Sequence, residues 1–173
     1  MDRRTMLIAF AGSALATPLA ARDAPQDTAE ASKEDVPMGR KIVEQFAATL
    51  SAQDLKGFAA LFAEDYINHQ VSAAAPVPPG GTQAKQLTLA HFAARLQGLP
   101  DLKVTIEAIV ATEDKAAASF VYEGTHQGLY IGFEPTGRRL RFTSCDIFSI
   151  REGKITEHWG MGDIAGVLMQ LRG

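Results

Sequence analysis

The sequence predicts an α+β domain. In the first half of the chain apolar residues recur at helical spacing, whereas in the second half apolar and polar residues alternate as they do in strands. The last residues return to helical spacing. A run of helices followed by a run of strands is typical of the α+β class rather than of folds in which the two alternate.

Three helices are expected before residue 100. Asp54 and Thr82 precede the second and third of them and are the predicted N-caps, and the third ends near Gly98. Residues 72–83 are rich in Ala, Pro and Gly and predict a loop that could act as a lid. The apolar stripes of the three helices are Ile42, Val43, Phe46 and Leu50; Leu55, Phe58, Ala59 and Phe62; and Leu89, Phe92, Ala93 and Leu96.

About four long antiparallel strands and a final helix are expected after residue 100. The first strand alternates with Val104 and Val110 on one side, and Asp163 is the predicted N-cap of the final helix. The strand segments are "LKVTIEAIV", "AAASFVYEGTHQGLYIGF", "RRLRFTSCDIFSI" and "KITEHW". Helices packed across one face of a strongly curved antiparallel sheet would enclose a conical cavity, a common place for a ligand.

The chain divides into three parts. Residues 1–21 have a charged start, a short apolar centre and small residues near the end, which predicts an export signal, of the twin-arginine or the general secretory type. The apolar centre is too short for a stable membrane anchor. Residues 22–37 are polar and Pro-containing and predict a flexible tether, so the folded domain is expected at 38–173. The expected destination is the periplasm of a bacterium.

Composition excludes several classes of function. The net charge is −3, without a basic stripe, so no nucleic-acid partner is expected. Cys145 is the only cysteine, which excludes an internal disulfide. The four histidines show no short ligand spacing, so no metal site is expected. Gly160, Gly162 and Ala165 match a dinucleotide-binding fingerprint, but the chain lacks the strand and acid that this site needs further on.

Asp146 is the most informative residue of the sequence. Period-two alternation from Leu140 to Ile150 places it on the apolar face of its strand, together with Phe142. A carboxylate is costly to bury unless it is paired, so Asp146 is either a structural acid with an arginine or main-chain partner, or a general base whose pKa is set by its surroundings.

Further polar candidates lie on two other segments. His126 shares a strand face with Tyr122, and it is either a satisfied core or rim histidine or a catalytic residue. Tyr66, Asn68 and His69 occur in "DYINHQ", just before the Ala- and Pro-rich loop, where they form either a pocket rim or a simple turn.

The segment "EHWGMGD" offers one more candidate. Strict alternation from Ile155 places Trp159 toward the cavity and His158 on the opposite face, where His158 would be a surface residue unless a bulge intervenes. Asp163 is expected to act as a helix cap only.

An ordered set of motifs resembles the SnoaL-like polyketide cyclase group of the NTF2-like superfamily, whose members are often called ester cyclases. The motifs are "FAALFAEDYINHQ", "LPDLKVTIEAIVATEDKAAASFVYEGTHQG", "PTGRRLRF", "DIFSIREGKITEHW" and "DIAGVLMQL", and they cover about residues 40 to 172. The resemblance implies an α+β cone with a deep pocket, often a homodimer through the sheet. It also implies catalysis without metal or cofactor, Asp146 as the base, and His126 as a pocket histidine. His69 and Trp159 resemble further lining residues.

Two hypotheses about function follow. In the first, the protein is a cofactor-independent cyclase, isomerase or lyase that acts on a small, largely apolar carbonyl compound. Asp146 would remove a C–H proton, and His126, supported by His69 or Asn68, would hydrogen-bond the enolate oxygen. Tyr66, Tyr122, Phe142 and Trp159 would line the site. In the second hypothesis, the protein is a non-catalytic periplasmic binder of a hydrophobic small molecule.

Overall fold

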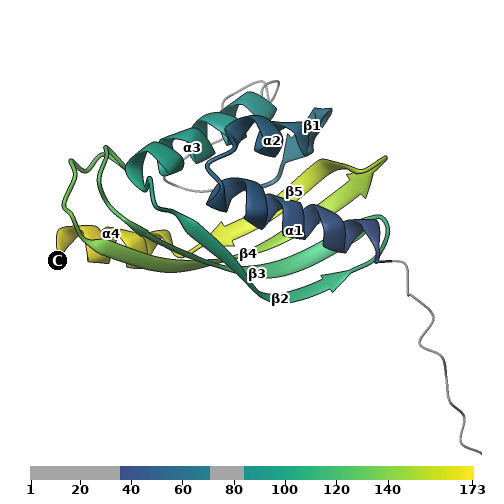
Figure 1. The fold of residues 1–173 in the computed structure, drawn as a ribbon. Helices are drawn as coiled ribbons and strands as arrows, with labels where there is room; N and C mark the ends of the chain where they lie inside the picture. The colour runs from purple at the N-terminus through teal and green to yellow at the C-terminus, as the bar shows by residue number, and fades with distance from the viewer. Residues whose placement is uncertain (1–35, 71–83) are drawn as a thin grey trace, which may run out of the picture. The chain divides into compact units, whose positions relative to one another are not determined.

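A single five-stranded sheet organises the fold (Figure 1). The computed structural model describes residues 36–70 and 84–173. The strands lie in the order β1-β5-β4-β3-β2; β1 runs parallel to β5, and all other neighbours are antiparallel. The strands are β1 (Phe62–Asn68), β2 (Lys103–Ala111), β3 (Lys115–Thr125), β4 (Arg139–Arg151) and β5 (Lys154–Gly162).

The three N-terminal helices lie over one face of the sheet, and the last helix follows β5 at the end of the sheet (Figure 1). They are α1 (Met38–Ser51), α2 (Leu55–Ala60), α3 (Ala84–Gly98) and α4 (Ile164–Arg172). Two predicted N-caps are confirmed: Asp54 accepts a hydrogen bond from the Gly57 amide, and Asp163 accepts one from the Gly166 amide, both at 2.8 Å. The predicted α+β class is therefore confirmed.

Aromatic side chains fill the space between helices and sheet. The Phe46 ring on α1 lies 5.1 to 5.6 Å, centroid to centroid, from four other phenylalanine rings, which come from α2, α3, β3 and β4. Burying one such ring contributes roughly 1.5 to 3 kcal/mol. Because this cluster packs three helices against two strands, it determines which face of β4 points inward. The four rings are Phe58, Phe92, Phe120 and Phe148.

Strand β1 was not predicted. Its burial does not alternate: Phe62 and Tyr66 are buried and the residues between them are partly or fully exposed. Its pairing with β5 is irregular between Phe62 and Ile67, so β1 lacks the period-two pattern of a regular strand. The sheet is therefore mixed rather than wholly antiparallel.

Two β-bulges also change the expected side-chain directions. One interrupts the pairing of β2 with β3 between Ile106 and Ala108, and it leaves Val110 77% exposed instead of on the same face as Val104. The other interrupts the pairing of β4 with β5 between Ser149 and Ile150. Each bulge inserts one residue, and a shift of one residue turns every later side chain to the other face.

Some sequence predictions lie outside the described residues. These are the export signal (1–21), most of the tether (22–37), the Ala- and Pro-rich loop (72–83) and the Thr82 cap. Among the helices within 36–70 and 84–173, none has the length and apolar character needed to span a membrane.

Candidate active site

Asp146 lies on the inner face of the sheet, as its alternation predicted. It is 6% exposed, whereas its neighbours Cys145 and Ile147 point outward and are exposed. Phe148, the next inward residue of β4, is fully buried. Asp146 therefore lies next to the aromatic core and not on the surface.

An imidazole, not an arginine, is the ionisable partner of Asp146. His158 on β5 places Nε2 2.7 Å from Asp146 Oδ1, and the His158 ring stacks on Phe148 with 5.0 Å between ring centroids. The Ser144 hydroxyl donates to the other carboxylate oxygen, Oδ2. Within the described residues no Lys or Arg nitrogen lies within 4.0 Å of the Asp146 carboxylate.

The predicted orientations of His158 and Trp159 were wrong. His158 is 3% exposed and points inward, whereas Trp159 is 37% exposed on the outer face. The bulge near Thr156 is the reason: Ser149 pairs with Glu157 but Ile150 pairs with Ile155, so Thr156 is the extra residue that reverses the alternation.

Hydrogen bonds extend from His158 toward α3. A carboxylate only accepts, so Nε2 of His158 carries the proton, and in the neutral ring Nδ1 accepts from the Tyr66 hydroxyl at 3.2 Å. The Thr88 hydroxyl donates to the Tyr66 oxygen at 3.5 Å, and the Asn68 amide donates to Thr88 at 3.2 Å. Every donor in this chain points toward Asp146, so each bond polarises the next.

Burial raises the pKa of the Tyr66 phenol, and the charge of Asp146 raises it further, although the hydrogen bond from Thr88 has the opposite effect. Tyr66 is therefore protonated at neutral pH and available as a donor to His158. This agrees with the direction of the hydrogen-bond chain.

Tyr122 and Phe142 form an aromatic wall beside Ser144. Their rings stack with 5.0 Å between centroids on adjacent positions of β3 and β4. Burial and the charge of Asp146 raise the pKa of the Tyr122 phenol, whereas Arg95 and a hydrogen bond with Ser144 lower it, and the net change is upward. Tyr122 thus keeps its O–H proton next to the carboxylate.

A glycine provides the room for the contact between Asp146 and His158. Gly160 pairs with Asp146 in the sheet, and a Cβ atom at this position would lie 2.5 Å from Asp146 Oδ1 and 2.7 Å from His158 Nε2. Neither atom could stay in place beside a methyl group. Any residue larger than glycine would therefore disturb this pair.

The structure does not bring His126 to Asp146. His126 follows β3, eight residues beyond Ala118, which pairs with Asp146, and this corresponds to about 26 Å along the strand. The His126 ring is fully buried, and its Nδ1 lies 2.9 Å from the Thr136 hydroxyl. His158, and not His126, is the imidazole that contacts the Asp146 carboxylate.

His69 lies with Trp159 away from the inner face. Their rings stack with 4.4 Å between centroids, and His69 Nε2 is 2.8 Å from Glu157 Oε2. Both residues border an outer groove of about 690 Å³ that extends over β2 to β5. Asp146 borders the same groove, and its carboxylate bonds to His158 and Ser144 on the inner face.

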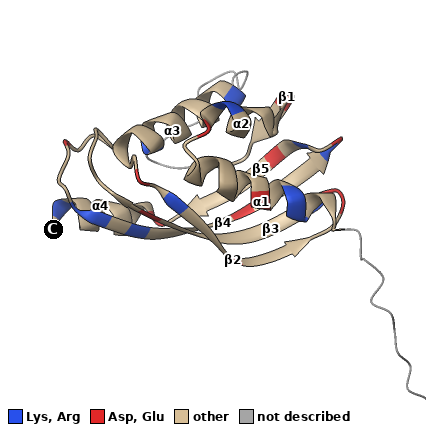
Figure 2. Ribbon diagram, viewed as in Figure 1, with Lys and Arg blue, Asp and Glu red and all other residues tan. Residues whose placement is uncertain are grey.

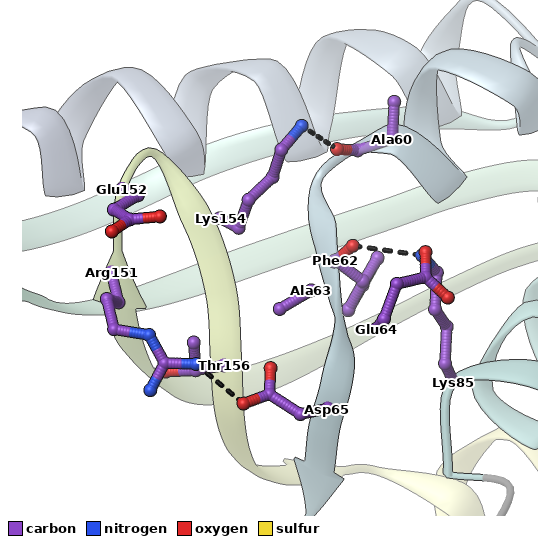
Figure 3. A pocket seen from close by; sticks show the side chains of 10 residues that line it. All are labelled: Ala60, Phe62, Ala63, Glu64, Asp65, Lys85, Arg151, Glu152, Lys154 and Thr156. Carbon is purple, nitrogen blue, oxygen red and sulfur yellow. Dashed lines mark hydrogen bonds and ion pairs between the residues drawn. The ribbon is translucent and has the colours of Figure 1, made fainter.

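A second hollow, of about 380 Å³, lies between β1 and β5 (Figure 3). Its three cationic side chains already have partners: Lys85 contacts Glu64 and Arg151 contacts Asp65, both at 2.6 Å, and Lys154 donates to the Ala60 carbonyl. Lys85 and Arg151 are therefore paired with carboxylates, whereas Lys154 and Glu152 have no ion-pair partner within the described residues.

No group of three His, Cys, Asp or Glu side chains within the described ranges is arranged to hold a metal ion. The arrangement around Asp146 can instead accept a proton. Its carboxylate is held by two donors in a largely apolar interior, with protonated tyrosines on either side.

Sequence reasoning missed His158, Ser144, Thr88 and Arg95 at this site. Ser144 is in phase with Asp146 and Thr88 with Phe92, so periodicity alone could have placed both on inner faces. Arg95, three residues after Phe92, could have been found in the same way. His158 could not, because its direction depends on the bulge.

Comparisons with known proteins support the same fold and family. IdmH from Streptomyces antibioticus, provisionally described as a polyketide cyclase, is 28% identical over 78% of this chain and 99% of its own, with a TM-score of 0.66. AclR from Streptomyces galilaeus, provisionally described as a hydroxylase, is 25% identical over 77% of this chain and 94% of its own, with a TM-score of 0.63.

A SnoaL-like cyclase structure from Jannaschia sp. CCS1, whose function is also provisional, matches in fold alone. It is 16% identical over 81% of this chain and 97% of its own, with a TM-score of 0.63. Curated protein sequences give no match. The model of the SnoaL-like polyketide cyclases matches residues 40–171, three quarters of the chain, and the protein belongs to this family.

Proposed function

We propose that the protein is a cofactor-independent enzyme that uses Asp146 as a general base on a small, largely apolar carbonyl compound. One observation carries the proposal: a nearly inaccessible carboxylate on the inner face of the sheet whose side-chain partners among residues 36–70 and 84–173 are an imidazole and a hydroxyl. A purely structural acid at such a depth would be expected to pair with a guanidinium or with main-chain amides.

The proposed reaction begins with the transfer of one proton. The Asp146 carboxylate takes a proton from a carbon next to the substrate carbonyl, which leaves an enolate and a neutral carboxylic acid. His158 and Ser144 hold the carboxylate in position before the transfer. The Tyr122 hydroxyl is the candidate donor to the enolate oxygen, because it stays protonated beside Ser144. Cyclisation by aldol attack, isomerisation or elimination could follow from the same enolate.

Replacing the acid by its amide tests this proposal. Asp146→Asn keeps the size of the side chain but removes the base, so we expect kcat to fall by about 10²- to 10⁴-fold with little change in melting temperature. The assay uses a panel of β-keto esters, lactones and steroid-like ketones. Glu123→Gln, a change on the outer side of β3, is the matched control and should leave kcat unchanged.

Two outcomes would contradict the proposal. Equal turnover by Asp146→Asn and the wild type would show that Asp146 is not the base. Saturable binding of panel compounds without conversion of any of them would favour a non-catalytic carrier of a hydrophobic molecule.

A further inference from the structure

Arg95 on α3 is a buried cation that lies on the same side of the sheet as the Asp146 side chain. It is 7% exposed, and its guanidinium carbon lies 4.8 Å from the centroid of Phe92, 4.9 Å from Tyr122 and 5.4 Å from Phe142. Its Nε donates to the Tyr130 hydroxyl at 3.2 Å. Arg95 therefore lies over the aromatic wall next to Ser144.

No carboxylate neutralises this cation within residues 36–70 and 84–173. The only other hydrogen-bond partner of Arg95 there is His91, whose Nε2 accepts from Nη2 at 2.9 Å. A guanidinium has five N–H donors, and a buried charge is normally paired with an opposite charge. The aromatic faces compensate in part, and within the described residues only Nε and Nη2 of Arg95 donate hydrogen bonds, so Nη1 has no partner there.

The guanidinium keeps its charge in this environment. Burial lowers the pKa of Arg95, but Tyr130, Tyr122 and Asp146 raise it by more, and the net change is upward. Loss of water around the His91 ring and the neighbouring charge of Arg95 lower the pKa of His91 to about 4. His91 is thus neutral near pH 7 and does not compete as a second cation.

His126 provides a second unsatisfied donor next to Tyr130. The Thr136 amide donates to His126 Nδ1 at 3.2 Å, so the neutral ring carries its proton on Nε2. This Nε2 is buried and has no hydrogen-bond partner in the described part of the chain. The His126 and Tyr130 rings lie 6.4 Å apart, and Arg95 donates to the Tyr130 hydroxyl, so both groups lie near the same tyrosine.

We propose that Arg95, with His126 as a neighbouring donor, binds a carboxylate-type group on an otherwise apolar ligand. A guanidinium matches a carboxylate with two parallel hydrogen bonds, and the rings around Arg95 suit an apolar body. The inference rests on the proposed function for the other end of this ligand, which would lie at Asp146. Asp146 is four residues beyond Phe142, about 13 Å along β4, so the substrate would be an extended keto acid.

Octanoate and octan-1-ol are a matched pair of probes for this site, since they differ mainly in the charged group. Isothermal titration of the wild-type protein should give a dissociation constant at least about tenfold lower for octanoate, because hydrogen bonds to a charged partner are the stronger ones. Equal affinities, or no binding of octanoate, would overturn the proposal.

Arg95→Gln removes the charge, and we expect it to abolish the preference for octanoate over octan-1-ol. Arg40→Gln, an exposed arginine on α1, is the control and should keep the preference. An Arg95→Gln protein that folds and still prefers octanoate would contradict the assignment.

A measurement on the wild type keeps the proposal testable if Arg95→Gln fails to fold. The carboxyl carbon of [1-¹³C]octanoate should titrate at a lower pH in the complex than in free solution, because a neighbouring guanidinium favours the ionised form. An unchanged or raised titration midpoint would exclude a cationic partner.

Asp146→Asn separates the two proposals. This variant should still bind octanoate while its turnover is lost. Weak octanoate binding with a normal effect of Asp146→Asn on turnover would overturn only the anion site. Normal octanoate binding with full turnover by Asp146→Asn would overturn only the catalytic role.

Discussion

At the scale of single residues, the Asp146 carboxylate depends on two neighbours and on one missing side chain. His158 and Ser144 donate to its two oxygens, and Gly160 leaves the space in which His158 reaches it. Water cannot replace these hydrogen bonds, because Asp146 and His158 are both less than 7% exposed. The loss of either donor would leave a buried charge under-satisfied.

Gly160→Ala should separate His158 from Asp146. The added methyl group would lie within 2.7 Å of both partners, so we expect a loss of about 1 to 3 kcal/mol in the free energy of unfolding, measured by urea denaturation. Gly162→Ala is the control on the same strand face, because its nearest neighbours would be 4.0 Å away. Similar stability of the two variants would mean that the pair can move apart without cost.

Asp146 could be predicted from sequence because the pairing of β4 with β3 is continuous from Leu140 to Ser149, so Asp146 and Phe148 stay on the face that alternation predicts. His158 could not be predicted, because one extra residue at Thr156 reverses the direction of everything that follows in β5. The distance between His126 and Asp146 could not be predicted either. Alternation shows which face of its strand a side chain lies on, but it does not show how far apart two residues lie along neighbouring strands.

At the scale of elements, caps and periodic stripes were the reliable signals. The helices were expected from apolar spacing and from Asp54 and Asp163, and both side chains cap as predicted. Strand β1 was missed because it pairs with β5 only near its ends, which leaves no alternating pattern to detect. Local chemistry is thus visible in the sequence, whereas irregular pairing between distant segments is not.

Removal of the Asp163 cap should loosen α4 without unfolding the domain. Asp163→Ala deletes the acceptor of the Gly166 amide, and we expect a cost of about 0.5 to 2 kcal/mol. Hydrogen exchange at the Gly166 amide should be faster by a matching factor. Asp163→Asn, which can still accept, is the control, and equal exchange in both variants would show that the side chain does not stabilise the helix.

At the scale of the whole molecule, the outer face of the sheet is unusually apolar. The exposed apolar side chains lie in neighbouring register positions on β2, β4 and β5, and Figure 2 shows these strands as largely uncharged with isolated acidic positions. Soluble proteins rarely leave such contiguous patches uncovered. The exposed fractions are 77% for Val110, 48% for Ile147, 37% for Trp159 and 79% for Met161.

We propose that a second copy of the chain covers this face, as the family resemblance implied. The patch extends from β2 to β5, and its groove is lined mainly by apolar side chains. Such a surface can pair with the same surface of a second copy about a two-fold axis. The inner face, with Asp146 and Arg95, would remain separate from such an interface.

Met161→Glu should therefore convert a dimer into a monomer. A charge at this position would face an apolar partner surface and lose its water, so we expect the dimer dissociation constant to rise by at least about tenfold, measured by sedimentation equilibrium. Met169→Glu is a matched control, because Met169 is 72% exposed but lies on α4, away from the patch. A wild-type protein that sediments as a monomer would exclude the dimer. Equal dissociation constants for the two variants would place the dimer contact elsewhere. If dimerisation is lost while turnover and octanoate binding persist, each copy carries a complete site.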